Sequence, residues 1–544
     1  MSLNGPFING KWLETGEKFT SVNPATGEPF AEVFAANGEH VSLAFEAAER
    51  SFREWSKLPL SVRLEHFKRL KTVLLDSLEE IAKTIAVEQG KPLTEALLVE
   101  LLPALDSLDY YIHRAAEHLE PLKVRHWQVL FRDKKAHYRF EPIGVVAVIS
   151  PWNYPFIIPF LDITAALLTG NTVVFKPSSV TPVVGVRIAE LFERAGFPDG
   201  TVNLLTGRSD VGQAIVGHES TRVIMFTGSV ETGRAIYRMA ADGVKKIVLE
   251  LGGKDPAVVM PDADLKRAVN GILWGAFMNA GQTCASIERV YVHRGIYDDF
   301  VEMVTELTAR LKVGDPLEPS TDIGPMTTAS QLQLVKFHVR EALEDGAKLL
   351  IGGEEFGRGF FYSPAVIVDV NHEMRIMRDE TFGPVMPIMK FDSLDEAIAL
   401  SNDTNYGLTA SIWTRDRETA SQFIRMVEAG TVTVNDHVFS FGEPEGAWGG
   451  VKFSGIGRTH GRFGLLELVN VKFVSEDYSR GESKLWWYPY DERLLEVAKL
   501  AGTSMYSESH SSKLRATMRL MRHAGLLLKK VGIKLLALNP GRFI

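Results

Sequence analysis

The sequence predicts an α/β fold made of two open, doubly wound domains with a protruding hairpin that serves oligomerisation. Short apolar segments alternate with helical segments from about residue 143, and a second alternation begins at 256 and runs to about 470. Such alternation is typical of parallel sheets that carry helices on both faces. The chain has 544 residues, which is several times the length of a typical domain.

The composition excludes several classes of protein. A hydrophobic fraction of 45% with 24% charged residues is that of a globular chain, so wholesale disorder is excluded. One cysteine makes neither an internal disulfide nor a cysteine-rich zinc site, and we predict no metal site. A net charge of −8 argues against a nucleic-acid partner. No signal peptide is readable at the N-terminus, so we expect a cytoplasmic enzyme or assembly protein.

The N-terminal part is predicted to hold small hairpins followed by helical cover. Ile8-Asn9-Gly10-Lys11 carries the Asn-Gly signal of a tight hairpin, and residues 23–27 indicate another turn. Apolar positions recur at helical spacing from about 41 to 118. Residues 126–142 alternate across a charged turn, which predicts an exposed hairpin of the kind that pairs with another subunit's sheet edge.

The first alternation predicts a doubly wound, nucleotide-binding sheet. Its expected strands are Val145–Ile149, Thr172–Phe175, Val202–Leu205, Val223–Phe226 and Ile247–Leu249, and its expected helices are 157–168, 181–196, 209–217 and 230–240. The uncharged stretch 143–161 is long enough for a transmembrane helix, but three prolines argue against one. The second alternation has expected strands near 288–293, 364–368, 410–414 and 431–434, and an active site is expected in the cleft between the domains.

Three residues carry the chemistry that the sequence suggests. Cys284 ends a loop of small residues; a lone cysteine is usually an inert core residue, but this one lies among residues that leave a thiol approachable. Glu250 follows an apolar strand and precedes two glycines, and would act as a base unless it is an ordinary ion-paired glutamate. Asn153 ends another strand, where its amide could donate to an oxyanion.

A glycine-rich turn supplies a fourth feature. Phe226-Thr-Gly228-Ser229-Val-Glu-Thr-Gly233 leads from a strand into a helix, and a helix N-terminus with small residues favours a bound phosphate.

Seven short motifs make the chain resemble the aldehyde dehydrogenase superfamily from about Phe7 to Phe473. They are Ser150-Pro-Trp-Asn153, Phe175-Lys176-Pro-Ser, Phe226-Thr-Gly-Ser229, Glu250-Leu-Gly-Gly-Lys254, Gly281-Gln-Thr-Cys284, Glu380-Thr-Phe-Gly-Pro384 and Gly450-Val-Lys-Phe-Ser-Gly455. All seven occur in the family's order, so chance agreement is not credible.

The resemblance implies a reaction, NAD(P)-dependent oxidation of an aldehyde to a carboxylic acid. Cys284 would attack the aldehyde, the Asn153 amide and the Cys284 backbone N–H would hold the oxyanion, and Glu250 would activate the water that hydrolyses the thioester. Relatives that transfer the acyl group to coenzyme A commonly lack this glutamate, so hydrolysis is expected. The implied contacts to NAD or NADP are Trp152, Lys176, Ser179, Gly228, Ser229, Gly233, Leu251, Glu380 and Phe382.

The resemblance also implies a division of the chain. Residues 1–125 and 144–252 would form the cofactor-binding domain, and 253–470 the catalytic domain. Residues 126–143 with 471–490 would form the oligomerisation arm of a homodimer or homotetramer, and 491–544 a basic amphipathic tail.

Two positions depart from the family pattern. Relatives that prefer NAD commonly have Glu where this chain has Ser179, so NADP is expected to be tolerated or preferred. Many relatives have a lysine at Asp162; if this carboxylate approaches Glu250, it raises the pKa of the base, and otherwise it caps or pairs elsewhere.

Substrate and location stay open between alternatives. Cys284-Ala-Ser-Ile-Glu-Arg289 and Gly455-Ile-Gly-Arg458-Thr-His460-Gly resemble some bacterial succinate-semialdehyde dehydrogenases, whose substrate would require a cation in the tunnel. The tail from 509 to 544 holds eight Lys and Arg and no acid, so it either contacts a membrane, which would favour long-chain aldehydes, or packs on a subunit. A catalytically retired scaffold on the same fold is the alternative to an enzyme.

Overall fold

The computed structural model describes residues 5–128, 131–478, 483–523 and 525, and it divides into two compact units. The first unit comprises Met1–Leu119 and Glu141–Asn470, and the second comprises Glu120–Phe140 and Val471–Ile544. The second unit therefore contains both the arm and the tail that the sequence analysis treated as separate segments.

The first sheet of the first unit holds eight strands in the order β2-β1-β9-β8-β7-β10-β11-β21. They are β1 (Phe7–Ile8), β2 (Lys11–Trp12), β7 (Val145–Ile149), β8 (Thr172–Lys176), β9 (Val202–Leu204), β10 (Thr221–Thr227), β11 (Lys246–Glu250) and β21 (Gly455–Ile456). The five strands from β9 to β11 are parallel, and their order reverses between β7 and β10. Ligands of such sheets bind at the carboxyl ends of the strands beside this reversal.

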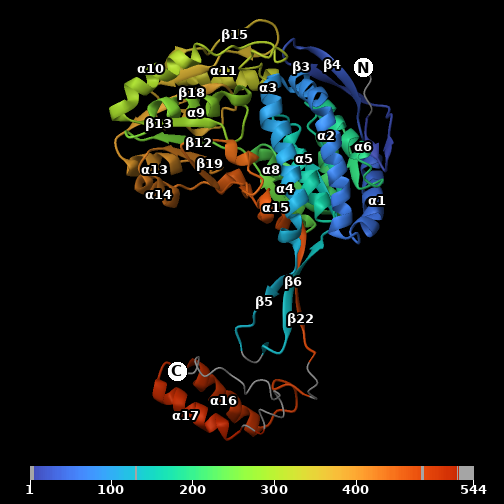
Figure 1. Cartoon of the computed structure of the whole chain (residues 1–544). Helices are drawn as coiled ribbons and strands as arrows, with labels where there is room; N and C mark the ends of the chain where they lie inside the picture. The colour runs from blue at the N-terminus through green and yellow to red at the C-terminus, as the bar shows by residue number, and fades with distance from the viewer. Residues whose placement is uncertain (1–4, 129–130, 479–482, 524, 526–544) are drawn as a thin grey trace. The chain divides into compact units, whose positions relative to one another are not determined.

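Helices cover both faces of this sheet because its strands alternate side chains between two cores. Val146 and Val148 join one core, and Val145 and Ala147 join the other. The helices on the first face are α2 (Leu60–Gln89), α4 (Leu102–Leu119), α5 (Ile157–Leu168) and α6 (Pro182–Arg194), and those on the second are α1 (Gly38–Trp55), α7 (Ser209–Gly217) and α8 (Val230–Asp242) (Figure 1).

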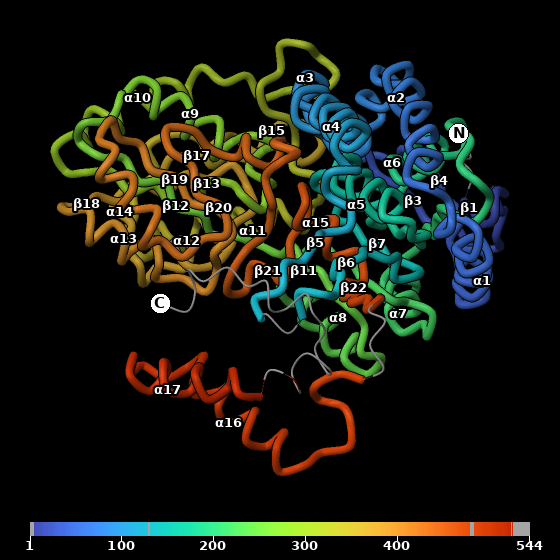
Figure 2. Tube along the Cα trace, turned by 60° about the horizontal axis from the view of Figure 1, so that its bottom comes forward, coloured from blue at the N-terminus to red at the C-terminus, as the bar shows by residue number. Residues whose placement is uncertain are grey.

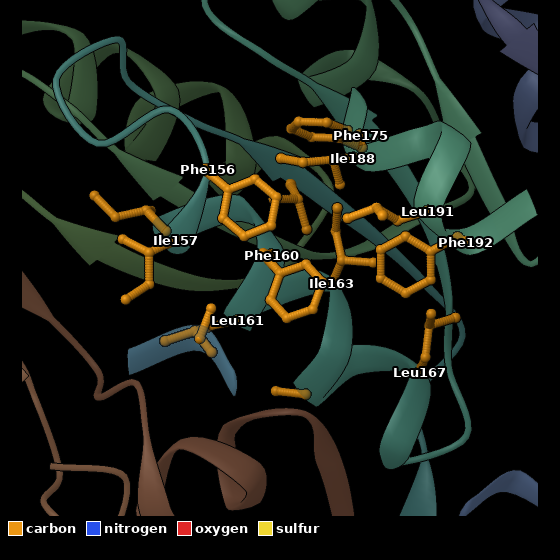
Figure 3. Close-up of a cluster of buried hydrophobic side chains, with 14 of the residues drawn as sticks. Phe156, Ile157, Phe160, Leu161, Ile163, Leu167, Phe175, Ile188, Leu191 and Phe192 are labelled. Carbon is orange, nitrogen blue, oxygen red and sulfur yellow. The ribbon is translucent and has the colours of Figure 1, made fainter. Parts of the chain in front are cut away.

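Helix α5 is buried along its whole length and fixes the loop that precedes it. Phe156 stacks on Phe160 with 5.1 Å between ring centroids, and Phe160 packs on Phe192 of α6 at 5.9 Å (Figure 3). The loop 150–156, which follows β7, is therefore held against a rigid apolar layer.

The second sheet of the first unit has the order β14-β17-β18-β13-β12-β19-β20, and only β14 is antiparallel to its neighbour. Its strands are β12 (Asp255–Val259), β13 (Ile287–His293), β14 (Lys348–Ile351), β17 (Ala365–Val368), β18 (Val385–Phe391), β19 (Thr409–Trp413) and β20 (Thr431–Val434). Its helices are α9 (Leu265–Phe277), α10 (Tyr297–Thr308), α11 (Ala329–Glu344), α12 (Arg375–Arg378), α13 (Leu394–Asn402) and α14 (Arg417–Met426). Two small elements, α3 (Leu93–Ala96) and a π-helix (Leu97–Leu101), precede α4.

The remaining elements of the first unit are short. They are the pair β3 (Lys18–Asn23) and β4 (Glu28–Phe34), the pair β15 (Glu355–Phe356) and β16 (Phe361–Tyr362), helix α15 (Gly461–Glu467), and 3-10 turns at Met278–Gly281, Arg294–Ile296, Phe439–Gly442 and Lys452–Ser454.

The second unit consists of a three-stranded sheet and two helices. Strand β6 (Lys135–Pro142) lies between β5 (Leu122–Val124) and β22 (Val469–Glu476). Helices α16 (Glu492–Tyr506) and α17 (His510–Met521) lie side by side (Figure 2).

The alternation predicted strands β7 to β11 and helices α5 to α8 of the first sheet, and strands β13, β17, β19 and β20 of the second; the predicted α/β fold class is confirmed. Strand β7 and helix α5 have the predicted bounds, and the Asn9-Gly10 hairpin is formed, with both residues at positive φ. The hairpin predicted across 126–142 is wrong in detail: its first strand is β5, at 122–124, and residues 131–134 form turns. Within the described residues, no helix has the length and apolarity to cross a bilayer.

Candidate active site

A strained loop after α9 presents the only cysteine. Asn279 and Ala280 have left-handed backbone dihedrals, with φ of 55° and 53°. Gly281 has φ +68°, and a Cβ there would lie 2.1 Å from the Gly383 carbonyl oxygen. Glycine is therefore required where this loop meets the loop 380–384. Cys284 follows and is partly exposed, rather than packed in the core, and it lines a cavity.

The cavity beside Cys284 has a volume of about 260 Å³ and apolar walls. Its lining consists of Leu98, Val99, Pro103, Tyr154, Ile158, Trp274, Met278, Thr283, Cys284, Ala285, Val438, Phe439, Phe441, Gly442 and Trp448. No acidic or basic side chain belongs to this lining, although four tryptophan or phenylalanine rings do. The cavity thus fits an apolar group next to the thiol.

Asn153 lies at the carboxyl end of β7, as predicted, and is buried against the cysteine loop. Its Nδ2 donates to the Gln282 carbonyl oxygen at 2.9 Å, two residues before Cys284. Its own carbonyl oxygen accepts from Asn279 Nδ2 at 2.9 Å and from Lys91 Nζ at 3.1 Å. The amide is therefore fixed beside the cysteine loop, where an oxyanion donor is needed.

Glu250 ends β11 and is buried, and within the described structure neither carboxylate oxygen accepts a hydrogen bond. A Cβ on Gly449 would lie 3.0 Å from Glu250 Oε1, so the carboxylate lies beside the residue that follows Trp448 of the cavity wall. Burial raises the pKa of Glu250 well above its usual range, Asp162 raises it further, and Arg458 opposes both. A carboxyl with a raised pKa and free oxygens is suited to act as a general base.

Asp162 is buried on α5, and its charge acts on Glu250. Burial raises the pKa of Asp162 to about 8. The negative charge of Asp162 thus acts in the direction expected if this carboxylate approaches Glu250.

The pKa of the Cys284 thiol is raised. Burial raises it first, the negative charges of Glu380, Asp255 and Glu250 raise it further, and a hydrogen bond from the Ala285 backbone opposes the shift. The thiol is neutral at pH 7 in this environment, so its attack requires that a proton is removed.

A second cavity, of about 650 Å³, is lined by two of the predicted cofactor residues, Ser229 and Glu380. Ser229 precedes α8, and its hydroxyl accepts from the Thr232 N–H at 3.3 Å. The lining residues are Ser229, Val230, Glu231, Arg234, Arg238, Leu334, Phe337, His338, Arg375, Asp379, Glu380 and Tyr406. A small-residue turn at a helix N-terminus with two nearby arginines fits a pyrophosphate.

The other predicted cofactor residues are not part of the lining of this cavity. Lys176, at the end of β8, is buried, and its Nζ donates to the Pro177 carbonyl oxygen at 3.2 Å; burial lowers its pKa to about 8. Gly233 lies so close to Leu251 that a Cβ would come within 2.5 Å of the leucine side chain. Trp152 and Phe382 form an edge-to-face ring pair at 5.4 Å.

Hydrogen bonds to Gly253 and to Glu288 hold the turn that carries Glu380. Glu380 accepts from the Gly253 N–H at 3.0 Å, and burial, then the charge of Glu288, raises its pKa to about 8. Glu288 accepts from the backbone N–H groups of Thr381 and Phe382, at 2.7 and 2.8 Å. The predicted positions Gly228 and Ser179 lie at the ends of β10 and β8 and are partly exposed.

The sequence analysis assigned no role to four buried ionic residues that position the site, Lys254, Glu288, Lys91 and Glu100. Lys254 Nζ donates to Glu288 at 2.6 Å, which fixes the turn at Glu380. Lys91 pairs with Glu100, lies 3.8 Å from the Tyr154 ring centroid, and donates to Asn153. Glu100 also accepts from the N–H groups at the start of α5, at 2.9 and 3.1 Å. A single glutamate within the apolar run 97–102 was the available signal.

Comparisons with known proteins agree with this geometry. The model of the aldehyde dehydrogenase family matches residues 12–474. The chain belongs to the aldehyde dehydrogenase family. It is therefore an oxidoreductase that oxidises aldehydes, and its cofactor is NAD or NADP.

Two curated relatives have different substrates by name. The chain is 40% identical over 436 residues to a 4,4'-diapolycopene aldehyde oxidase from Methylomonas, which covers 80% of this chain and 81% of the relative. It is 36% identical over 482 residues to a lactaldehyde dehydrogenase from Escherichia coli strain K12, which covers 87% and 98%.

Two solved structures have the same fold over most of this chain. An NAD+ complex of an aldehyde dehydrogenase from Bacillus cereus has a TM-score of 0.84, with 34% identity, 88% of this chain and 97% of that chain covered. An NADP-dependent enzyme from E. coli has a TM-score of 0.84, with 34% identity and 87% and 98% covered.

Proposed function

We propose that this aldehyde dehydrogenase oxidises apolar aldehydes through a covalent Cys284 thioester that a water activated by Glu250 hydrolyses. The observation that carries the proposal is the apolar cavity, about 260 Å³ in volume, that opens beside Cys284. Cys284, which lines this cavity, is the nucleophile that the sequence predicts.

The reaction begins when the thiol proton is removed and sulfur attacks the aldehyde carbon, which forms an S–C bond. The thiol proton is lost to solvent in this step, so Glu250 keeps both oxygens free to accept a proton from water later in the cycle. The carbonyl oxygen becomes an oxyanion, and the Asn153 amide, held by the Gln282 carbonyl, supplies a donor beside it. A bound nicotinamide cofactor would supply the acceptor for the hydride that leaves this carbon, which is what oxidises the thiohemiacetal to a thioester.

Hydrolysis completes the cycle. Glu250 takes a proton from water, the hydroxide adds to the thioester carbon, and the C–S bond breaks with the thiolate as leaving group. The products are a carboxylic acid and the free cysteine. Residues Lys176, Ser229 and Glu380 would hold the cofactor through its ribose and pyrophosphate groups.

The cavity favours an apolar aldehyde over a charged one. A semialdehyde that ends in a carboxylate needs a cation in its tunnel, and the lining contains no lysine, arginine or histidine. One relative is named for a hydrocarbon aldehyde and another for lactaldehyde, so sequence identity alone does not select between them. The apolar lining is what supports the first class.

The test of the mechanism separates acylation from hydrolysis. Cys284→Ala should abolish aldehyde-dependent NAD(P)H formation, whereas Glu250→Gln should keep a stoichiometric burst but lose turnover, with an acyl group retained on the protein by mass spectrometry. Turnover in Cys284→Ala, or an unchanged steady-state rate in Glu250→Gln, would overturn the assignment. A retired scaffold would form no NAD(P)H with any aldehyde.

We also propose that NADP is accepted because Ser179 places no carboxylate beside the adenosine ribose. Assembly as a homodimer or homotetramer through the second unit stays a prediction, which sedimentation velocity would measure.

A further inference from the structure

Helices α16 and α17 form a hairpin beyond residue 474, outside the part of the chain that matches the family. Ser504 and Thr517 hydroxyls lie 2.6 Å apart, and Arg519 pairs with Glu496 at 2.9 Å. Thr517 contacts the end of α16, whereas Arg519, further along α17, contacts its beginning, so the helices are antiparallel. The reaction of the family needs neither helix, and the hairpin therefore requires a separate explanation.

The outward face of α17 carries an aligned apolar stripe. Leu514, Met518 and Met521 are 61%, 51% and 66% exposed, and their spacing of four and three residues places them on one side of the helix. Ala516, about half a turn away, is buried. Single exposed apolar residues are ordinary, but a stripe of three long side chains along one helix marks a contact surface.

Basic residues border this stripe. From 509 to 523 the sequence contains Lys513, Arg515, Arg519 and Arg522 and no aspartate or glutamate. Arg515 and Arg522 each follow a stripe residue by one position, about 100° around the helix. In the described residues, neither arginine has a carboxylate within ion-pair distance, while Arg519 pairs with Glu496.

We propose that this face of α17 docks on an anionic lipid surface. The three apolar side chains would enter the boundary between headgroups and acyl chains, and Arg515 and Arg522 would pair with lipid phosphates. The charge of the helix and the charge of the lipid are complementary, which is the observation that selects this occupant. The helix lies on the membrane in this arrangement and does not cross it.

A second copy of the chain fits this face less well. A symmetric contact through the stripe would bring Arg515 and Arg522 of both copies together with no acid on α17 to offset them. Three side chains also cover far less than the roughly 800 Å² per partner of a stable interface. The lipid surface meets neither difficulty.

The test uses the full-length chain and vesicles of phosphatidylcholine, with or without phosphatidylserine, in a co-sedimentation assay. The wild-type chain should bind the phosphatidylserine vesicles and lose binding as salt is raised. Leu514→Glu with Met518→Glu should weaken binding by at least about tenfold. Arg515→Gln with Arg522→Gln should weaken it roughly tenfold or more on anionic vesicles only.

The matched control is Leu75→Glu on α2, which makes the same chemical change at a leucine that is 56% exposed in the first unit. Its binding should equal that of the wild type, and all variants should keep their activity on a water-soluble aldehyde, which reports folding. Equal binding to neutral and anionic vesicles, or unchanged binding of the stripe variant, would overturn the proposal.

A sedimentation-velocity measurement distinguishes docking on lipid from contact with a second copy of the chain. If the stripe variant lowers the mass of the oligomer and leaves vesicle binding intact, the face contacts a second copy and the lipid proposal is wrong. Vesicle binding by a chain that prefers short polar aldehydes would refute the proposed substrate class and leave the docking surface standing.

Discussion

The dependence of kcat/KM on aldehyde chain length follows from the volume and walls of the cavity beside Cys284. The cavity of about 260 Å³ holds roughly nine heavy atoms, at about 30 Å³ for each water-sized group. Each methylene that leaves water for an apolar wall contributes about 0.8 kcal/mol, or close to a fourfold gain. Four added methylenes, from butanal to octanal, then contribute about 3 kcal/mol and raise kcat/KM roughly 200-fold.

The assay is initial-rate formation of NAD(P)H with straight aldehydes of increasing length. We expect a steep rise up to the length that fills the cavity and a plateau beyond it, because further carbons reach solvent. A flat series, or a kcat/KM for lactaldehyde equal to that for octanal, would refute the reasoning.

A charge placed in the cavity wall gives a sharper version of the same test. Leu98→Lys introduces a cation into the lining, and should lower kcat/KM for octanal while raising it for succinate semialdehyde. Leu102→Lys is the matched control, since this exposed leucine lies one turn away and outside the lining. Equal effects of the two substitutions would show that the wall does not select the substrate.

Three further predictions concern groups around the site. Asp162→Asn removes a negative charge that raises the pKa of Glu250. Because Glu250 accepts a proton only when it is deprotonated, the rate of thioester hydrolysis should rise at lower pH in this variant than in the wild type. Single-turnover measurements across a pH series would show the shift. Lys91→Met leaves the buried carboxylate of Glu100 without its cation and should lower the free energy of unfolding, measured in urea, by about 3–5 kcal/mol, with a loss of kcat. Lys71→Met removes one partner of a half-exposed ion pair and should lower it by about 1 kcal/mol or less. Ser179→Glu should reduce kcat/KM for NADP at least about tenfold and leave NAD nearly unchanged, because a carboxylate repels the 2′-phosphate.

Each of these has an outcome that contradicts it. Superimposable pH profiles for Asp162→Asn and the wild type would show that the two carboxyls do not interact. Equal losses of stability at positions 91 and 71 would mean that burial does not decide the strength of the pair. If the wild type strongly prefers NAD and Ser179→Glu leaves that preference unchanged, Ser179 does not determine whether the 2′-phosphate of NADP is accepted.

Local patterns predicted the elements of the first sheet because both of its faces are buried. Residues 145–149 are an unbroken apolar run, which is typical of a strand that is buried on both faces. Strand β7 has those bounds. Strands β12 and β18 were missed, since Pro256 and Pro387 interrupt their runs. Helix α16 was not predicted; it packs on α17, an element that the sequence does not show to be its neighbour.

The three proposed catalytic groups could be predicted from local motifs, and the residues that hold them in place could not. Cys284, Glu250 and Asn153 stand at strand ends or in a small-residue loop, where a motif is visible in one line of sequence. Lys91 acts on Asn153 across 62 positions, through a hydrogen bond of 3.1 Å. Such a contact depends on where α5 packs, and no local pattern reports it.

The sequence alone also could not predict how the pKa values of the site residues are shifted, and these shifts decide how the reaction depends on pH. Glu250 and Cys284 are each recognisable as a base and a nucleophile, but burial raises the pKa of both. Glu380 and Asp255 add negative charge around the thiol, while Arg458 is the cation that lowers the pKa of Glu250. Burial thus shifts both groups toward their protonated forms, whereas the thiol must lose a proton to attack and Glu250 must be deprotonated to accept one from water. Activity should therefore rise with pH, and the rise follows from the burial of the two groups.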